Sequence, residues 1–476
     1  MGQERFTLRS SVFSFHRLWW LLLLPMFLVS GCGGPSAPIQ PFAQNPFYWS
    51  YDGRPVLLIG GSVEDNLFQI TGIEEQLDLL QSVGGNYVRC TMSSRDKGNV
   101  WPFQKDPDTG LYDLDEPNPE YWSRFSRFLE LTARGNIFVQ IELWATFDYY
   151  RDVWDVNPFN PKNNINYSAA ESGLPTRVTT HPTRTENPFF RSVPAEDDNT
   201  IVLQYQEQFV NQLLSYSLEY GHVLYCMDNE TSVTPEWGAY WASFVRNRAA
   251  EEGVTVQTTE MWDPWDLSHP MHDNTFDHPE LYTFVDISQN NHQRGQTHWD
   301  NAQAQRQRVI DSGDIRPLNN VKVYGADTGR YGTDRDGIER MWRNMFGGLA
   351  ATRFHRPTSG LGLNATAQAN IRSLRMITDS VNVFQAGPHN DLLSQRADNE
   401  AYCMAVPGRS YAIFFPEGGD VWLDVSGTGP EARLVIQWLD IPASQWQEAT
   451  ETEGDSRIRL QAPARGFWAV KIRAVQ

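Results

Sequence analysis

Short apolar segments of β character alternate with longer segments of helical periodicity through most of this 476-residue sequence. The candidate strands are 55–61, 85–92, 136–143, 222–228, 254–260, 282–288, 321–326 and 350–355. Helix-like segments, such as 121–133 and 202–220, separate most of them. Such alternation favours a parallel sheet covered by helices. Eight strands in about 300 residues predict an α/β fold of the (β/α)8 TIM-barrel type.

The pattern changes after residue 390. Short β-rich runs then follow one another between Gly, Pro, Asp and Ser residues, at 401–406, 411–415, 421–425, 434–439, 458–460 and 467–472. This spacing is typical of a small antiparallel β-sandwich. We therefore predict a barrel domain over residues 46–388 and a β-sandwich domain over residues 389–476.

The N-terminus has the features of an export signal. Arg5, Arg9 and Arg17 precede an apolar run over 18–29, which is short for a membrane span and fits a signal-peptide core. The run ends in Leu28-Val29-Ser30-Gly31-Cys32, which resembles the bacterial lipobox. We expect a signal peptide over 1–31, lipidation at Cys32 and a tether over 32–45. The resemblance implies an exported lipoprotein at the outer membrane or cell surface; the alternative is an ordinary signal peptide with a chance cysteine.

The net charge of −19 argues against a nucleic-acid partner, which would require a basic surface. The same charge repels anionic polymers at long range unless the cleft is locally basic. Aromatic residues make up 13% of the chain, with 17 Trp and 18 Tyr, so some rings are candidates for stacking on sugars. Cys90, Cys226 and Cys403 cannot all pair, and we expect buried thiols. Neither their spacing nor that of the histidines suggests a metal site, and no cofactor is expected.

A long polar segment, 149–199, follows the third candidate strand. Active sites of (β/α)8 barrels form at the carboxyl ends of the strands. A loop of this length at that end is either functional or disordered, and we expect it to help build a cleft.

The fourth candidate strand ends in Asp228-Asn229-Glu230. A Glu at the rim of a barrel strand points towards the site, where it can protonate a glycosidic oxygen. Asn229 beside it can hydrogen-bond a sugar hydroxyl. The alternative is a polar pair that only caps the following helix. We predict Glu230 as the catalytic acid.

These residues resemble the clan A glycoside hydrolases, which place their acid/base Glu after Asn at the end of strand four. Asn86-Tyr87-Val88-Arg89 looks like the Arg element of that clan at strand two, and Arg89 is expected to orient a catalytic carboxylate. The segment 52–69 and the C-terminal sandwich resemble apiosidase-like barrels that carry a domain named for collagen binding. That name is no indication that this chain binds collagen.

The sequence departs from this pattern at strand seven. The clan carries a nucleophilic Glu there, whereas the matching stretch, 321–330, holds only Asp327. Asp327 could be a nucleophile, an inverting base, a relic in a binding barrel, or a turn residue in Asp-Thr-Gly. Other carboxylates at predicted strand ends are Glu260, Glu142 and Asp148.

Further substrate contacts are expected from side chains at or just beyond the predicted strand ends. These are Trp144, Trp262, Asn290, His292, Arg353 and His355. The sequence thus predicts a glycoside hydrolase acting on a plant or algal polysaccharide or oligosaccharide. The alternatives are a catalytically silent carbohydrate-binding barrel and an adhesion lipoprotein that uses the sandwich.

Overall fold

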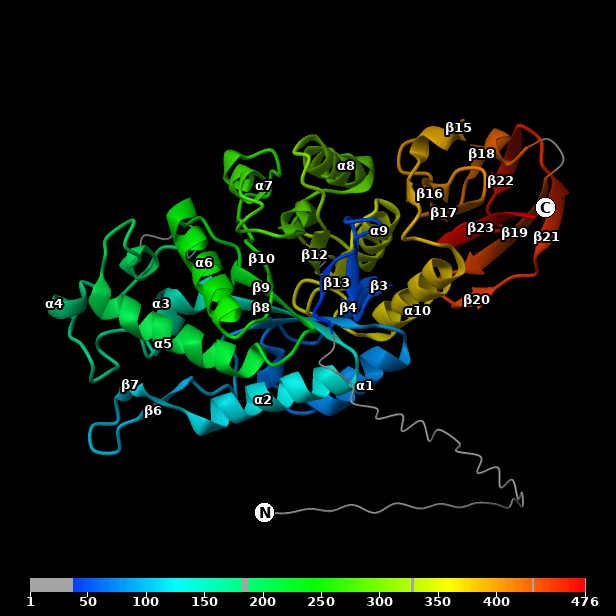
Figure 1. The fold of residues 1–476 in the computed structure, drawn as a ribbon. Helices are drawn as coiled ribbons and strands as arrows, with labels where there is room; N and C mark the ends of the chain where they lie inside the picture. The colour runs from blue at the N-terminus through cyan, green and yellow to red at the C-terminus, as the bar shows by residue number, and fades with distance from the viewer. Residues whose placement is uncertain (1–36, 182–186, 327–328, 430–431, 476) are drawn as a thin grey trace, which may run out of the picture. The chain divides into compact units, whose positions relative to one another are not determined.

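The computed structural model describes residues 37–181, 187–326, 329–429 and 432–475 (Figure 1). The predicted signal peptide (1–31), Cys32 and Asp327 lie outside the described residues. Within the described part, no helix combines the length and apolar character needed to cross a bilayer.

Eight parallel strands form the predicted barrel, in the order β10-β9-β8-β5-β4-β13-β12-β11. Their bounds are β4 (Leu58–Gly61), β5 (Tyr87–Thr91), β8 (Phe138–Trp144), β9 (Val223–Asp228), β10 (Gln257–Thr259), β11 (Val285–Asp286), β12 (Leu318–Val323) and β13 (Ala351–Phe354). Strands such as β8 and β9 are buried along their whole length, as expected where helices cover a parallel sheet.

Thr258 and Thr283 close the barrel between β10 and β11. The Thr283 amide donates to the Thr258 carbonyl at 2.9 Å, and the Thr258 amide donates to the Thr283 hydroxyl at 3.0 Å. The Thr258 hydroxyl donates to the carbonyl of Leu281. Side-chain hydrogen bonds thus supplement backbone pairing between these two short strands.

Helices surround the barrel (Figure 1). They are α1 (Ile73–Ser82), α2 (Pro119–Arg134), α5 (Thr200–Ser217), α6 (Pro235–Glu251), α7 (Asp273–Asp277), α8 (Gly295–Asp311), α9 (Asp334–Phe346) and α10 (Ala365–Ser380). The shortest of them, α7, has only five residues. Smaller elements are β1 (Gln40–Pro41), β2 (Trp49–Tyr51), β3 (Arg54–Val56), β6 (Phe103–Lys105), β7 (Tyr112–Pro117), α3 (Arg151–Trp154) and α4 (Ala169–Ser172).

Strand seven begins three residues earlier than predicted. The sequence suggested 321–326, but β12 spans Leu318–Val323. Asn319 and Asn320 are polar, yet both are fully buried, and the Asn319 side chain accepts a hydrogen bond from the Trp49 indole at 3.1 Å. A search for apolar runs therefore misses the start of this strand, and Tyr324 falls in the loop after it.

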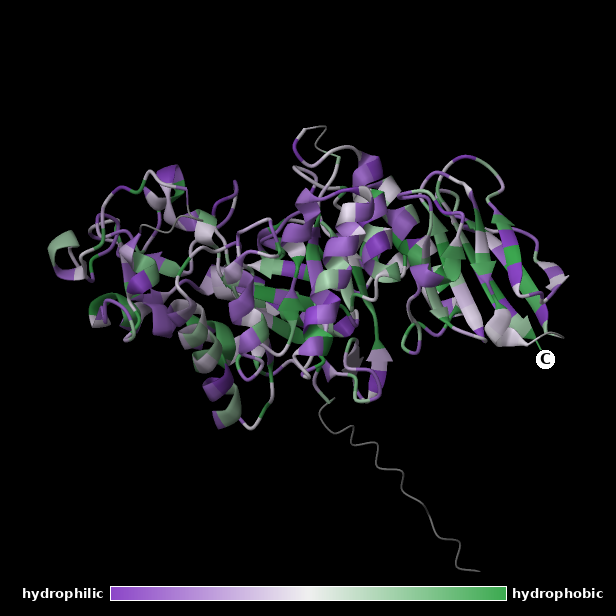
Figure 2. Cartoon of the chain, turned by 90° about the horizontal axis from the view of Figure 1, so that it is seen from above, coloured by the Kyte–Doolittle hydropathy of each residue, from purple (hydrophilic) through white to green (hydrophobic). Residues whose placement is uncertain are grey.

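The C-terminal strands form the predicted sandwich. One sheet contains β14 (Gly387–Pro388), β16 (Tyr402–Val406), β17 (Ser410–Phe415), β23 (Trp468–Val475), β19 (Arg433–Asp440), β20 (Gln445–Trp446) and β21 (Thr450–Glu453). The other contains β15 (Leu393–Ser394), β18 (Asp420–Asp424) and β22 (Arg457–Gln461). Figure 2 shows hydrophobic residues concentrated on the strands and polar residues on the outer helix faces.

Aromatic packing and hydrogen bonds join the sandwich to the barrel helices, as two examples show. The rings of Trp342 in α9 and Phe414 in β17 stack with centroids 5.1 Å apart. The Ser373 hydroxyl in α10 donates to the Ile441 carbonyl at 2.7 Å. The candidate residues lie at the carboxyl ends of the barrel strands and in the loops that follow them.

Candidate active site

Glu230 lies two residues beyond β9, at the carboxyl end of the barrel strands. Its φ is 54°, a left-handed conformation that costs free energy for a residue with a side chain and is found more often at functional sites. Hydrogen bonds on both sides hold the backbone in place: the Asn229 amide donates to the Trp144 carbonyl at 3.1 Å, and the Thr231 amide to the Met261 carbonyl at 3.0 Å. The Glu230 side chain is 13% exposed, so part of it is in contact with solvent.

A lysine from strand seven faces Glu230. The Lys322 ammonium, on β12, lies 2.8 Å from the Glu230 carboxylate, and the Lys322 side chain is 2% exposed. The same ammonium donates to the side-chain oxygen of Asn229. The Tyr324 hydroxyl donates to Glu230 at 3.0 Å. Glu230 is thus held by one cation and one phenol.

These contacts fix the charge of Glu230. Burial alone raises the pKa of a carboxyl group, but the charge and hydrogen bond of Lys322, with the charge of Arg89, outweigh it. The pKa of Glu230 falls to about 2. The group is therefore ionised near neutral pH, so in this state it is a base or nucleophile and has no proton to donate.

Arg89 binds two carboxylates at the base of the site. It lies 2.7 Å from Asp65 and makes a bidentate pair with Glu142, both bonds being 2.6 Å long. Although burial raises the pKa of Asp65, Arg89 and His355 hold it well below its usual range. Arg89 therefore binds the carboxylates of Asp65 and Glu142, and its orientation of a catalytic carboxylate stays a prediction. The sequence reasoning assigned no role to Asp65, which follows the first barrel strand.

His355 lies on the other side of Asp65, 3.2 Å from its carboxylate. The His355 ring also meets the Tyr324 ring edge to face, with centroids 4.6 Å apart. Burial lowers the pKa of His355 to about 4, so its imidazole is neutral near pH 7. His355 thus packs beneath the tyrosine that binds Glu230.

Four of the expected substrate contacts are at most 1% exposed, and His355 is also buried. The indole of Trp144 is fully buried among aromatic rings that include Trp241 at 5.0 Å, and the Trp262 indole donates to Thr275 at 2.7 Å. Asn290 donates to the His298 carbonyl at 2.8 Å, and Arg353 donates to the Val321 carbonyl at 2.8 Å. None of the four side chains presents a surface to a sugar in this state, so the expectation of direct contact does not fit their positions.

The long segment 149–199 explains the burial of Trp144. Tyr149 and Phe189 from this segment stack on each other at 4.3 Å and pack around the Trp144 indole. The segment therefore covers the barrel beside the third strand with an aromatic cluster. A strand-end tryptophan looks the same in sequence whether a loop covers it or leaves it open.

The other candidate carboxylates are also buried and bonded. Glu260 is fully buried and accepts from the Asp228 amide at 2.9 Å and the Met261 amide at 2.8 Å. Burial raises the pKa of Glu260 to about 8. Asp148 accepts from Ser93 and the Ser94 amide, and burial raises the pKa of Asp148 to about 6. Among the described residues, the atoms bonded to the Glu230 carboxylate come from Lys322 and Tyr324, and no carboxylate is among them.

His292 is half-buried near the rim, where its ring nitrogen lies 3.2 Å from the Arg330 guanidinium. The described residues contain no cluster of three or more side chains arranged to hold a metal ion. Cys90, Cys226 and Cys403 are all buried free thiols.

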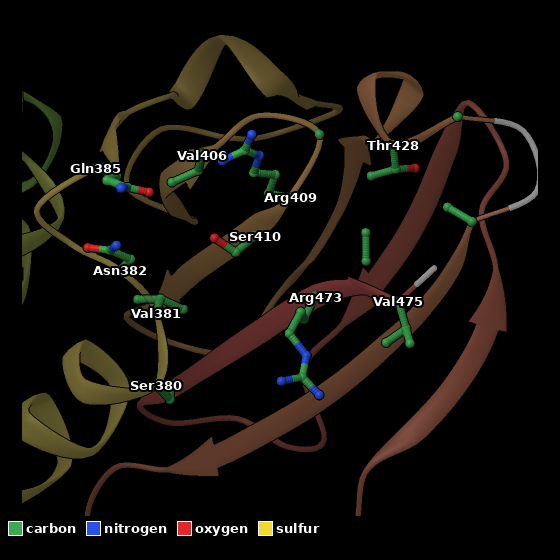
Figure 3. Close-up of a pocket in the computed structure, with 14 residues that line it drawn as sticks. Ser380, Val381, Asn382, Gln385, Val406, Arg409, Ser410, Thr428, Arg473 and Val475 are labelled. Atoms are coloured by element: carbon green, nitrogen blue, oxygen red, sulfur yellow. The ribbon is translucent and has the colours of Figure 1, made fainter.

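A large hollow, of about 980 Å³, lies away from these residues, beside the sandwich (Figure 3). Its lining includes Asn382, Gln385, Arg409 and Arg473, and none of the candidate catalytic residues. Size alone therefore does not identify the site, and the candidate site is defined by the side chains around Glu230.

Comparison with solved structures agrees with the fold. A family 5 glycoside hydrolase from Bacteroides vulgatus matches with a TM-score of 0.62 and 11% identity, over 92% of this chain and 93% of that one. Another structure described as a glycoside hydrolase gives 0.61 and 10%, over 92% and 97%. A family 5 mannosidase from Rhizomucor miehei gives 0.51 and 13%, over 73% and 100%. No protein-family model and no curated protein matches the sequence. The chain therefore shares its fold, a (β/α)8 barrel with a C-terminal β-sandwich, with these glycoside hydrolase structures.

Proposed function

We propose that this protein is a glycoside hydrolase that cleaves O-glycosidic bonds of a plant or algal polysaccharide or oligosaccharide. Glu230 is its general acid/base. The observation that carries the proposal is the placement of Glu230: a partly exposed carboxyl group, in a strained backbone conformation, at the carboxyl end of barrel strand four. A fold shared with glycoside hydrolases supports it.

Lys322 imposes a condition on this chemistry. An ionised carboxylate can attack an anomeric carbon or take a proton from water, but it cannot protonate a leaving oxygen. For Glu230 to act as the acid, the Lys322 ammonium must move off the carboxylate when substrate binds, which lets the pKa rise. Asp327, outside the described residues, is proposed as the second carboxylate.

The proposal is tested by assaying reducing ends released from a panel of plant and algal polysaccharides. We expect Glu230→Gln to lower kcat by roughly 10²- to 10⁴-fold, the usual contribution of a general acid/base, while glycan binding persists. Asp327→Asn should lower it by orders of magnitude as well. Glu236→Gln is the matched control, because Glu236 is exposed in the first turn of α6. Undiminished turnover in Glu230→Gln would refute the assignment.

A catalytically silent carbohydrate-binding barrel is the second candidate. The ion pair between Glu230 and Lys322 favours it, because a cation holds the carboxylate from the strand-seven side, where the resembling enzymes carry a nucleophilic Glu. Wild-type protein that binds a glycan of the panel but releases no reducing ends from it would establish this candidate over the hydrolase.

A further inference from the structure

Four aromatic rings in contact lead from solvent to Glu230. The Trp265 indole, 54% exposed after strand five, stacks on His292 after strand six, with centroids 6.3 Å apart and planes at 30°. His292 meets Tyr331 after strand seven at 5.2 Å, and Tyr331 meets Tyr324 at 4.2 Å. Tyr324 then hydrogen-bonds Glu230 at 3.0 Å. We call Trp265, His292, Tyr331 and Tyr324 the aromatic row.

Cations accompany this row. The exposed Arg330 guanidinium lies 3.2 Å from the His292 ring nitrogen and 5.4 Å from the centre of the Tyr331 ring. Lys322 lies at the inner end, beside Glu230. The row therefore has one cation at its open part and one at its buried end.

A third cation lies beneath the row. Arg340 is fully buried. Its guanidinium donates hydrogen bonds to the carbonyls of Gln293, Tyr324 and Tyr331, at 3.0, 2.9 and 2.8 Å. Among the described residues no carboxylate lies within ion-pair distance of Arg340. Asp336 and Glu339 oppose this charge from beyond ion-pair distance, while the direct hydrogen bonds of the guanidinium go to neutral carbonyls.

The nearby charges also affect the pKa of His292. Burial lowers its pKa first, and the charges of Arg330, Arg340 and Lys322 lower it further against the opposing charge of Glu230. The pKa of His292 is about 4, so the imidazole is a neutral hydrogen-bonding group between an indole and a phenol. Arg330 at the open part of the row and Arg340 beneath it are thus cations without an ion pair among the described residues, whereas Lys322 is paired with Glu230, on a chain whose net charge is −19.

We propose that the aromatic row binds a sugar ring that carries an anionic substituent, a carboxylate or a sulfate, next to the bond held at Glu230. The exposed face of Trp265 suits the apolar face of a pyranose, and Arg330 suits a bidentate bond to a carboxylate or sulfate. Local cations are needed for such a ligand, because the overall charge repels it at long range. The position of the scissile bond rests on the proposed function; the charge preference of the row does not.

Matched pairs of oligosaccharides test this preference. Oligogalacturonides are compared with their methyl esters, and sulfated galactan oligosaccharides with desulfated ones, by calorimetry on Glu230→Gln so that no turnover interferes. We expect at least one anionic member to bind roughly tenfold or more tightly than its neutral counterpart, and its affinity to fall with added salt. The pair that discriminates tells a carboxylate from a sulfate.

Arg330→Gln, made in the same background, should abolish the discrimination, while Trp265→Ala should weaken both members of the pair. Arg465→Gln is the control, since Arg465 is an exposed arginine of the sandwich. Equal affinity for both members of each pair, an unchanged preference in Arg330→Gln, or no binding of any anionic glycan would overturn the inference. Hydrolysis of a neutral glycan with no charge preference would support the proposed function and contradict the charge preference of the row. Charge-selective binding without hydrolysis would support the charge preference and contradict the proposed function.

Discussion

At the scale of single residues, the decisive feature is Lys322, which faces Glu230 from strand seven, where a second carboxylate was expected. The sequence places Lys322 between valines in a strand, a pattern that says nothing about which way its side chain points. The structure turns it into the barrel mouth, onto Glu230 and Asn229. Register along β12, which begins at Leu318, decides this direction.

Removing the ammonium should release the pKa of Glu230. In Lys322→Met, burial acts against only the weaker effects of Arg89 and Tyr324, so we expect the pKa to rise from about 2 to about 4.5 or above. Carbon-13 NMR of labelled glutamate, with Glu230→Gln to assign the resonance, measures it. Because Glu230 must carry a proton to act as the acid, the alkaline limb of the kcat–pH profile should move up with its pKa.

Lys322→Arg is the matched control, because it keeps the charge and should keep the pKa low. Since the folded-state pKa of Glu230 is depressed, its stabilisation is present above pH 4.5 and is lost as the pH falls towards 2. The shift corresponds to about 3 kcal/mol, which the Met variant should lack at neutral pH. A Glu230 that still titrates near 2 in Lys322→Met would show that another group sets its charge.

At the scale of elements, the strands and helices were predictable because hydrophobic periodicity encodes them. The helices α2 (Pro119–Arg134) and α5 (Thr200–Ser217) agree closely with the expected segments 121–133 and 202–220. The misses have one physical origin: side chains whose polarity is satisfied inside the fold. Asn319 and Asn320 start a buried strand, and Trp144 is covered by a polar-looking segment that folds over it.

Barrel closure between β10 and β11 depends on Thr258. We expect Thr258→Val, which keeps the shape but removes the donor to the Leu281 carbonyl, to destabilise the fold by about 1–3 kcal/mol. Urea unfolding followed by circular dichroism measures it. Thr109→Val is the control: that hydroxyl bonds Asp106 in an exposed turn, so its loss should cost under about 0.5 kcal/mol. Equal losses in the two variants would mean that the closure bond adds nothing special.

At the scale of the whole molecule, the two-part architecture was predictable, whereas the site was predictable only in part. Asn-Glu after a strand made Glu230 a candidate from sequence alone, because the motif is short and local. The partners of Glu230 come from positions 322 and 324, and the pairing of distant strands in three dimensions brings them there. Asp65 was missed for the same reason, since its importance follows from contacts with Arg89 and His355.

We propose that the chain is anchored to a membrane through a lipid on Cys32, which would place the barrel beside polymers outside the cell. Cys32→Ser should then move the protein from the membrane fraction to the soluble fraction in a bacterial host, because the modified thiol is lost. Fractionation and immunoblotting measure this, with the buried Cys403→Ser as control. Membrane association that survives Cys32→Ser would exclude the anchor.

The pairing of Glu230 with Lys322 also has a mechanical side. β9 and β12 are separated by β10 and β11 in one direction around the barrel and by four strands in the other, so the ion pair is a strut across the mouth. An ion pair that stiffens the rim in this way also occupies space between the two strands. Variants that widen the opening for bulky chains must therefore give up part of the rigidity that keeps the rim in shape, a trade of firmness against access that is common where active sites sit on stable scaffolds.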